Sequence, residues 1–270
     1  MDINCYWLLV IGYLLFVICR DTAMPCPPCP TSYTEKCINM SNKAQLLLNL
    51  LQLASPALPV GAYSYSDGLE TLVEQGVIES DRTLESWLRQ ELTFGAIRVE
   101  AAVMLRGYWC VLNHDLAKLA DWNRWLTASK ETSELRSQSW QMGNTLLRLL
   151  VNLEASNDSQ QLEEYATTVG NPCNYAIAFG IGAANWQIEA ENALLGYLHS
   201  WATNLIGVGV KMIPLGQTTG QKILLKLGDR LTLASQEILN LEDDDLMACS
   251  WGLGLASMTH ETQYTRLFRS

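Results

Sequence analysis

Residues 176–213, AIAFGIGAANWQIEAENALLGYLHSWATNLIGVGVKMI, decide the fold, because they form the least polar stretch of the chain after residue 40. Apolar residues recur there at helical spacing, without the alternation that is typical of a strand. Glu189, Glu191 and Lys211 make the stretch too charged for a clean membrane span. It therefore predicts a pair of helices at the centre of a helical bundle.

The same helical spacing extends along the chain before this central pair. Residues 115–152 predict two long helices that are separated by a polar joint near residues 129–132. Ser80 or Asp81 can cap an earlier helix, because both side chains accept hydrogen bonds from the free N–H groups of a first turn. Another helix is expected to begin near Ser66.

After the central pair, residues 217–227 and 231–239 predict two short amphipathic helices. No internal repeat or long linker divides residues 40–270. We therefore predict one all-α domain over residues 40–270, a single globular bundle-like fold of roughly ten helices.

The composition excludes two classes of protein. The chain has 270 residues, of which 49% are hydrophobic, and this fraction is too high for a disordered protein. Lys and Arg together number 18 against 28 Asp and Glu, which gives a net charge of −10. Such an acidic chain is unsuited to the phosphate backbone of nucleic acids, so we expect no nucleic-acid partner.

The first 39 residues differ from the rest and are interpreted as an N-terminal extension. Residues 3–19 form an uncharged run of 17 residues, which is the short end of what crosses a bilayer. A membrane anchor is one interpretation of residues 1–39. The other is an over-extended translation start, because Met40 opens a polar lead into a helical pattern. We favour the second interpretation and expect no membrane attachment.

Cysteine usage favours the cytoplasm. Five of the eight cysteines fall in the first 37 residues, and only Cys110, Cys173 and Cys249 belong to the rest of the chain. Three scattered cysteines do not make a disulfide framework, so we expect a reducing compartment.

The motifs that catalysis needs are missing from the sequence. Residues 216–222, GQTTGQK, come close to a phosphate-binding loop, but their glycines are one residue too near each other and neither glycine is adjacent to the lysine. Residues 61–65, GAYSY, lack the closing glycine of a nucleophile elbow. We therefore predict no enzymatic activity and no cofactor.

A metal site near the end of the chain stays open as an alternative. Cys249, Met258 and His260 could meet there as a soft nickel or copper site. The ordinary alternative is a buried thiol, a core methionine and a surface imidazole.

Two segments are unusual for connecting loops. Residues 55–70, SPALPVGAYSYSDGLE, combine prolines and glycines with two tyrosines, a residue type that is enriched at interfaces. Residues 258–270, MTHETQYTRLFRS, place aromatic residues beside arginines at a terminus, where chains usually fray. We interpret the second segment as one that docks onto a partner, whereas its alternative is a last helix that folds back onto its own bundle.

Three segments resemble the signatures of the urease accessory protein UreF family, in the family's order. They are residues 50–70, LLQLASPALPVGAYSYSDGLE, residues 199–221, HSWATNLIGVGVKMIPLGQTTGQ, and residues 256–270, ASMTHETQYTRLFRS. The resemblance runs over roughly residues 45–270. Thr259 stands where the family usually has a basic residue, which puts that one contact in question, and residues 1–39 have no counterpart.

The resemblance implies a function without catalysis. UreF-type proteins are all-α and dimerise, join the accessory protein UreD (also called UreH), and recruit the GTPase UreG. This assembly delivers nickel to apo-urease, and UreG turns over the nucleotide. The alternative is a metallochaperone that holds nickel directly through Cys249 and His260. A third hypothesis, a membrane-tethered helical protein, rests wholly on residues 3–19.

The motif match also assigns partner-binding residues in the two unusual segments. For the C-terminal segment, we expect ordering when the partner binds. The assigned residues are Tyr63, Ser64, Tyr65, Gly68 and Glu70 in the first segment, and Glu261, Gln263, Tyr264, Arg266, Phe268 and Arg269 in the second.

Overall fold

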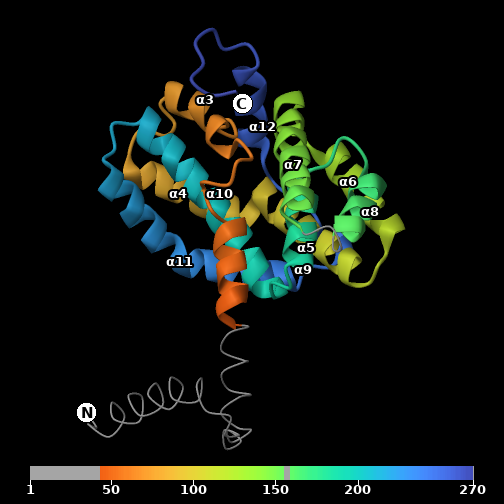
Figure 1. Cartoon of the computed structure of the whole chain (residues 1–270). Coiled ribbons are helices and arrows are strands. Elements are labelled where there is room, and N and C mark those ends of the chain that lie inside the picture. The colour runs from red at the N-terminus through yellow and green to blue at the C-terminus, as the bar shows by residue number, and fades with distance from the viewer. Residues whose placement is uncertain (1–42, 155–158, 270) are drawn as a thin grey trace, which may run out of the picture. The chain divides into compact units, whose positions relative to one another are not determined.

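The computed structural model describes residues 43–154 and 159–269, in which helices are joined by turns and loops (Figure 1). The described part holds eleven α-helices and no strand, which confirms the predicted all-α fold. The helices comprise residues 43–53, α3 (Leu69–Glu74), α4 (Asp81–Phe94), α5 (Ala96–Leu112), α6 (Leu116–Ser129), α7 (Ser133–Leu153), α8 (Ser159–Val169), α9 (Tyr175–Asn185), α10 (Ala190–Met212), α11 (Gln217–Leu239) and α12 (Trp251–His260), with 3-10 helices η1 (Ala62–Ser64) and η2 (Asp243–Asp245).

The chain divides into two compact units, residues 1–45 and 46–270. Both interpretations of residues 1–39 fall outside the described residues, and the boundary at residue 40 stays a prediction. Among the helices of the described ranges, none is long and apolar enough to cross a membrane.

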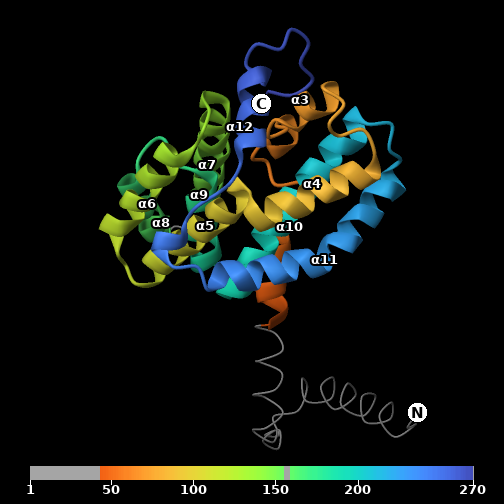
Figure 2. The same cartoon turned by 180° about the vertical axis from the view of Figure 1, so that it is seen from behind.

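The predicted central pair is α9 and α10. All residues of α9 from Ala176 to Ala184 are buried, and the helix packs against α5 and α7 (Figure 2). Glycines allow this close approach, because a Cβ at Gly180 would lie 2.4 Å from the Met104 carbonyl oxygen. A Cβ at Gly143 of α7 would lie 2.2 Å from the Cys173 carbonyl oxygen. The backbones of three helices therefore meet at α9.

Local signals place several helix ends as predicted. Ser80 caps α4, since the Thr83 N–H donates to Ser80 Oγ at 3.3 Å and the Ser80 N–H donates to Thr83 Oγ1 at 3.0 Å. The polar joint at residues 129–132 lies between α6 and α7, and Thr132 caps α7. The helix expected to begin near Ser66 begins instead at Leu69, because Asp67 and Gly68 adopt left-handed backbone conformations with φ of 51° and 77°.

The prediction of two short helices over residues 217–227 and 231–239 is wrong, because α11 is one continuous helix over both ranges. Leu227 and Leu231 are both buried and share one helix face, with Ala234 and Ile238 one and two turns further along. This buried face outweighs the local preference for a break between the leucines.

The close packing around α9 makes a stability prediction. We expect Gly180→Ala to lower the free energy of unfolding by about 3 kcal/mol, because the new methyl group overlaps a backbone carbonyl that cannot move aside. Gly228→Ala is the matched control, since Gly228 lies on the exposed side of α11 with no atom within 4 Å of its Cβ position. The control substitution should raise the free energy of unfolding by about 0.5–1 kcal/mol.

Urea unfolding followed by circular dichroism measures both variants. If Gly180→Ala were tolerated as well as Gly228→Ala, the close contact of α9 with α5 would be contradicted.

Candidate functional site

The two unusual segments, which are far apart in the sequence, lie side by side in the structure. Helix α12 packs against α3 (Figures 1 and 2), and the residues after it, 261–269 (here the tail), form hydrogen bonds with α3 and η1. The Arg269 N–H donates to the Ser64 carbonyl oxygen at 2.9 Å. Gly68 permits the contact with α12, because a Cβ there would lie 3.3 Å from the Ser257 nitrogen. The first and last of the three resembling segments therefore form one surface.

Glu70 is the residue that holds the tail. Its side chain is almost completely buried, with 2% exposed. Its carboxylate accepts hydrogen bonds from two successive tail amides, the Leu267 N–H at 2.6 Å and the Phe268 N–H at 2.9 Å. The carboxylate also sits in the first turn of α3, where the helix dipole favours a negative charge. A buried carboxylate is tolerated here because each oxygen has a donor.

His260 connects this carboxylate to α7. The imidazole is fully buried, and its Nε2 lies 3.2 Å from Glu70 Oε2 while its Nδ1 lies 2.8 Å from Glu134 Oε2. Each ring nitrogen therefore lies within hydrogen-bonding distance of a carboxylate oxygen. Arg266 of the tail donates to the other oxygen of Glu134 at 2.9 Å. Two carboxylates, one imidazole and one guanidinium therefore form a network that joins the tail to α3 and α7.

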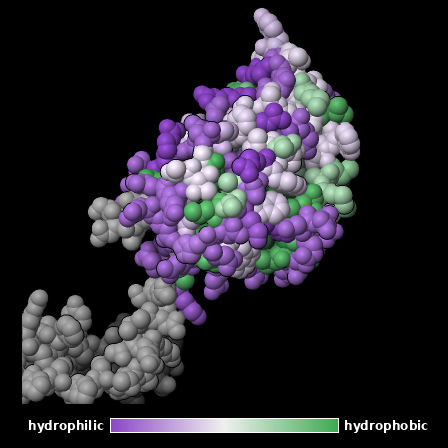
Figure 3. Space-filling model, turned by 90° about the vertical axis from the view of Figure 1, so that its right-hand side faces the viewer, coloured by the Kyte–Doolittle hydropathy of each residue, from purple (hydrophilic) through white to green (hydrophobic). Residues whose placement is uncertain are grey.

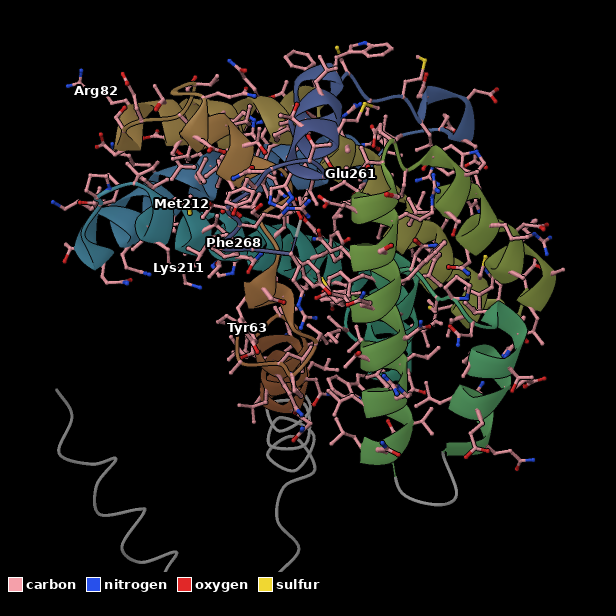
Figure 4. The ribbon with its side chains drawn as sticks, turned by 90° about the horizontal axis from the view of Figure 1, so that it is seen from above. Tyr63, Arg82, Lys211, Met212, Glu261 and Phe268 are labelled. Carbon is pink, nitrogen blue, oxygen red and sulfur yellow. The ribbon has the colours of Figure 1, made fainter. Side chains whose placement is uncertain are left out.

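The middle resembling segment reaches the same surface through α10. The Lys211 ammonium lies 5.3 Å from the centre of the Phe268 ring, and Figure 4 shows the two side by side. The Asn204 side chain donates to the Tyr65 carbonyl oxygen at 3.3 Å. A groove of about 270 Å³ lies between the chain around Tyr63 and helices α10 and α11. The three segments that resemble the family signatures therefore meet at one surface.

The residues assigned as partner-binding divide by exposure. Tyr65, Gly68, Glu70 and Phe268 are buried and hold the surface together from inside. Ser64 and Gln263 are half-buried and bonded within the surface, Ser64 to the Gly61 carbonyl and Gln263 to Thr71. Those exposed to solvent are Tyr63, Glu261, Tyr264, Arg266 and Arg269.

The tail is docked on its own domain in this structure. Phe268 is only 5% exposed, while Tyr264 is fully exposed and projects away from the domain. This arrangement matches the alternative of folding back and differs from the expectation that a partner must order the segment. The outer side of the tail is exposed to solvent, and its docking onto a partner stays a prediction.

Comparison with known proteins decides the family. A family model described as UreF matches residues 78–228, and a urease accessory protein UreF from a Nostoc species is 60% identical over 223 residues, which is 83% of this chain and 95% of that relative. The chain belongs to the UreF family of urease accessory proteins. Membership makes it an accessory protein of urease maturation and not an enzyme.

Other UreF proteins cover the same region. One from a Synechocystis species is 53% identical over 240 residues, which is 86% of this chain and all of that relative. One from a Janthinobacterium species is 40% identical over 228 residues, 84% of this chain and again all of the relative.

Sequence reasoning missed an apolar stripe on α12 of this UreF chain. Trp251, Leu255 and Met258 lie at helical spacing and are 80%, 63% and 52% exposed. On the side that carries α6 and α8, by contrast, hydrophobic residues form small groups among hydrophilic ones (Figure 3). The spacing of residues 251, 255 and 258 was a readable signal, but the segment chosen from the sequence began at residue 258. The stripe adjoins the tail because α12 leads directly into it.

The structure weighs against the nickel site proposed for Cys249 and His260. Both nitrogens of His260 already face carboxylates, and Cys249 is an exposed free thiol. The ordinary alternative also assigned burial the wrong way round, because the thiol and Met258 are exposed and the imidazole is buried. Within residues 43–154 and 159–269, no group of three or more His, Cys, Asp or Glu side chains is arranged to hold a metal ion.

A second cluster of charge lies beneath the surface, in a cavity of about 80 Å³. Its wall includes four carboxylates, those of Asp67, Glu91, Glu100 and Glu131, against the single ammonium of Lys130. Burial raises the pKa of Glu91 from its ordinary value of 4.5 to about 7, and the nearby charges of Asp67 and Glu131 add to the rise.

The tail network predicts the effect of removing its central carboxylate. We expect Glu70→Ala to lower the free energy of unfolding by about 3 kcal/mol, because two tail amides and His260 lose their acceptor. Limited proteolysis should then cut the tail faster than in the wild type. Glu74→Ala on the same helix is the control, since Glu74 is exposed. Equal stability and equal cleavage in the two variants would show that Glu70 does not hold the tail.

The cavity predicts a pH dependence of stability. Because Glu91 has a higher pKa in the folded chain than its ordinary value, the folded state binds the proton more tightly, and stability falls as pH rises from about 4.5 to above 7. Glu91→Gln should therefore be more stable than the wild type at pH 8, by about 3 kcal/mol at most, and equal to it near pH 4. Glu163→Gln, at an exposed position of α8, should change nothing. Urea unfolding at several pH values measures these stabilities. A Glu91→Gln variant that is less stable than the wild type at pH 8 would contradict the repulsion between Glu91 and its acidic neighbours.

Proposed function

We propose that this UreF chain bridges UreD (UreH) and the GTPase UreG during urease maturation and helps to deliver nickel to apo-urease. Nucleotide turnover belongs to UreG, and the chain itself supplies binding surfaces in the cytoplasm, as a homodimer. Family membership supports the role in maturation. Cys110, Cys173 and Cys249 are free thiols, which agrees with a reducing compartment.

The observation that carries the bridging role is the surface formed by α12, the tail and η1. It presents exposed aromatic and apolar side chains, Trp251, Leu255, Tyr264 and Tyr63, on a backbone that is fixed by buried bonds. Tryptophan, tyrosine and arginine dominate the energetics of protein interfaces, and a preformed surface avoids the cost of ordering a free segment. Arg266 and Arg269 add positive charge at its edge.

Substitutions on this surface separate binding from folding. We expect Trp251→Ala and Tyr264→Ala each to weaken co-purification with co-expressed UreD and UreG, by about thirty-fold for a side chain at the centre of the interface, which corresponds to about 2 kcal/mol. Both side chains are exposed, so the unfolding midpoint of the isolated chain should not change.

Leu225→Ala is the matched control, because Leu225 is 82% exposed on α11, outside this surface. If both surface variants recruited the two partners as well as the control does, the assignment of this surface would fail. Deletion of residues 261–270 is a less clean test, since it also leaves Glu70 without its donors.

A further inference from the structure

The cavity behind this surface contains one buried carboxylate without a partner among the described residues, that of Glu91. Asp67 accepts a hydrogen bond from Gln138 at 2.5 Å, and Glu100 forms an ion pair with Lys130. Glu91 is only 9% exposed, yet no described residue donates a hydrogen bond to its carboxylate. A buried carboxylate without a donor is costly, and Glu91 also meets repulsion from its acidic neighbours.

The charge of the cavity is negative in excess. Lys130 is the single cation of the wall against four carboxylates, and it forms an ion pair with Glu100. The same negative surroundings, after burial, raise the pKa of Tyr197, whose ring also lies in the wall. A bound cation would relieve both the repulsion and the missing hydrogen bond.

The walls identify the kind of cation. Trp87, Trp201, Tyr175 and Tyr197 line the cavity, and the last two rings are stacked with centres 5.7 Å apart. Aromatic faces beside a carboxylate suit ammonium and guanidinium groups, which gain from both. A directly coordinated metal ion fits less well, because the acidic residues of the described ranges are not arranged to hold one.

We propose that this cavity binds an organic cation, an ammonium or guanidinium group at the end of an alkyl chain, with Glu91 as its counter-ion. The cavity reaches the surface at Glu131, which is exposed, and Leu253 of α12 forms part of its wall. A free alkylamine and a lysine or arginine side chain of a docked protein carry the same group. The proposal does not depend on the bridging role.

Calorimetric titration of the full chain with butylammonium and propylguanidinium chloride tests the proposal, with 1-butanol as the neutral control. At pH 8 we expect saturable binding of both cations and none of 1-butanol. Binding should be about ten-fold weaker at pH 6, where Glu91 is mostly protonated. Glu91→Gln should weaken binding at pH 8 by about ten-fold and remove the pH dependence, while Glu163→Gln should bind like the wild type.

Asp67→Asn keeps the test informative if Glu91→Gln does not fold. Asparagine tolerates the left-handed backbone at this position, so only the charge is lost, and weaker cation binding is again expected. Absence of saturable binding at pH 8, equal binding of 1-butanol, or unchanged affinity in every folded charge variant would overturn the proposal.

The source of the cation is decided by competition. If a partner's side chain enters the cavity, saturating butylammonium should reduce co-purification of the wild type with UreD or UreG. If a free amine is the ligand, the complex should be unaffected while the titration still shows binding.

Discussion

The rest of the structure depends on the contact of α9 with α5 and α7, in which backbone meets backbone. At Gly180 and Gly143 there is no room for even a methyl group, because the carbonyl oxygens of Met104 and Cys173 occupy the place. This approach encloses α9 on all sides and buries Phe179 completely. The domain can therefore contain a helix with almost no polar residue although the chain as a whole is acidic.

The same core fixes the elements that build the candidate surface. Helix α7 packs against α9 through Gly143 and carries Glu134 in its first turn. Helix α10 follows α9 and carries Lys211 in its last turn. These elements present an acceptor and a cation at fixed places, and the tail bonds to both. Because Glu70 satisfies two tail amides, a segment of few apolar contacts can stay docked without a partner.

Local signals in the sequence were enough for much of the fold. The apolar stretch at residues 176–213 and the cap at Ser80 are properties of a few neighbouring residues, and both predictions hold. The continuity of α11 was missed, because the Gly-Asp pair after Leu227 resembles a break and only the core shows that Leu227 and Leu231 share a face. The network of Glu70 with His260 joins residues 190 positions apart, which no local pattern can indicate.

The two groups of buried charge differ in a way that separates packing from binding. In the tail network both carboxylates contact a cation or a backbone N–H, so the need to hold the tail accounts for every charge. In the cavity, no such structural need accounts for the charge of Glu91. A glutamine at position 91 would fill the same volume without the repulsion that Asp67 and Glu131 exert on Glu91. Packing alone therefore leaves the carboxylate unexplained, whereas a cationic ligand between aromatic walls gives it a partner.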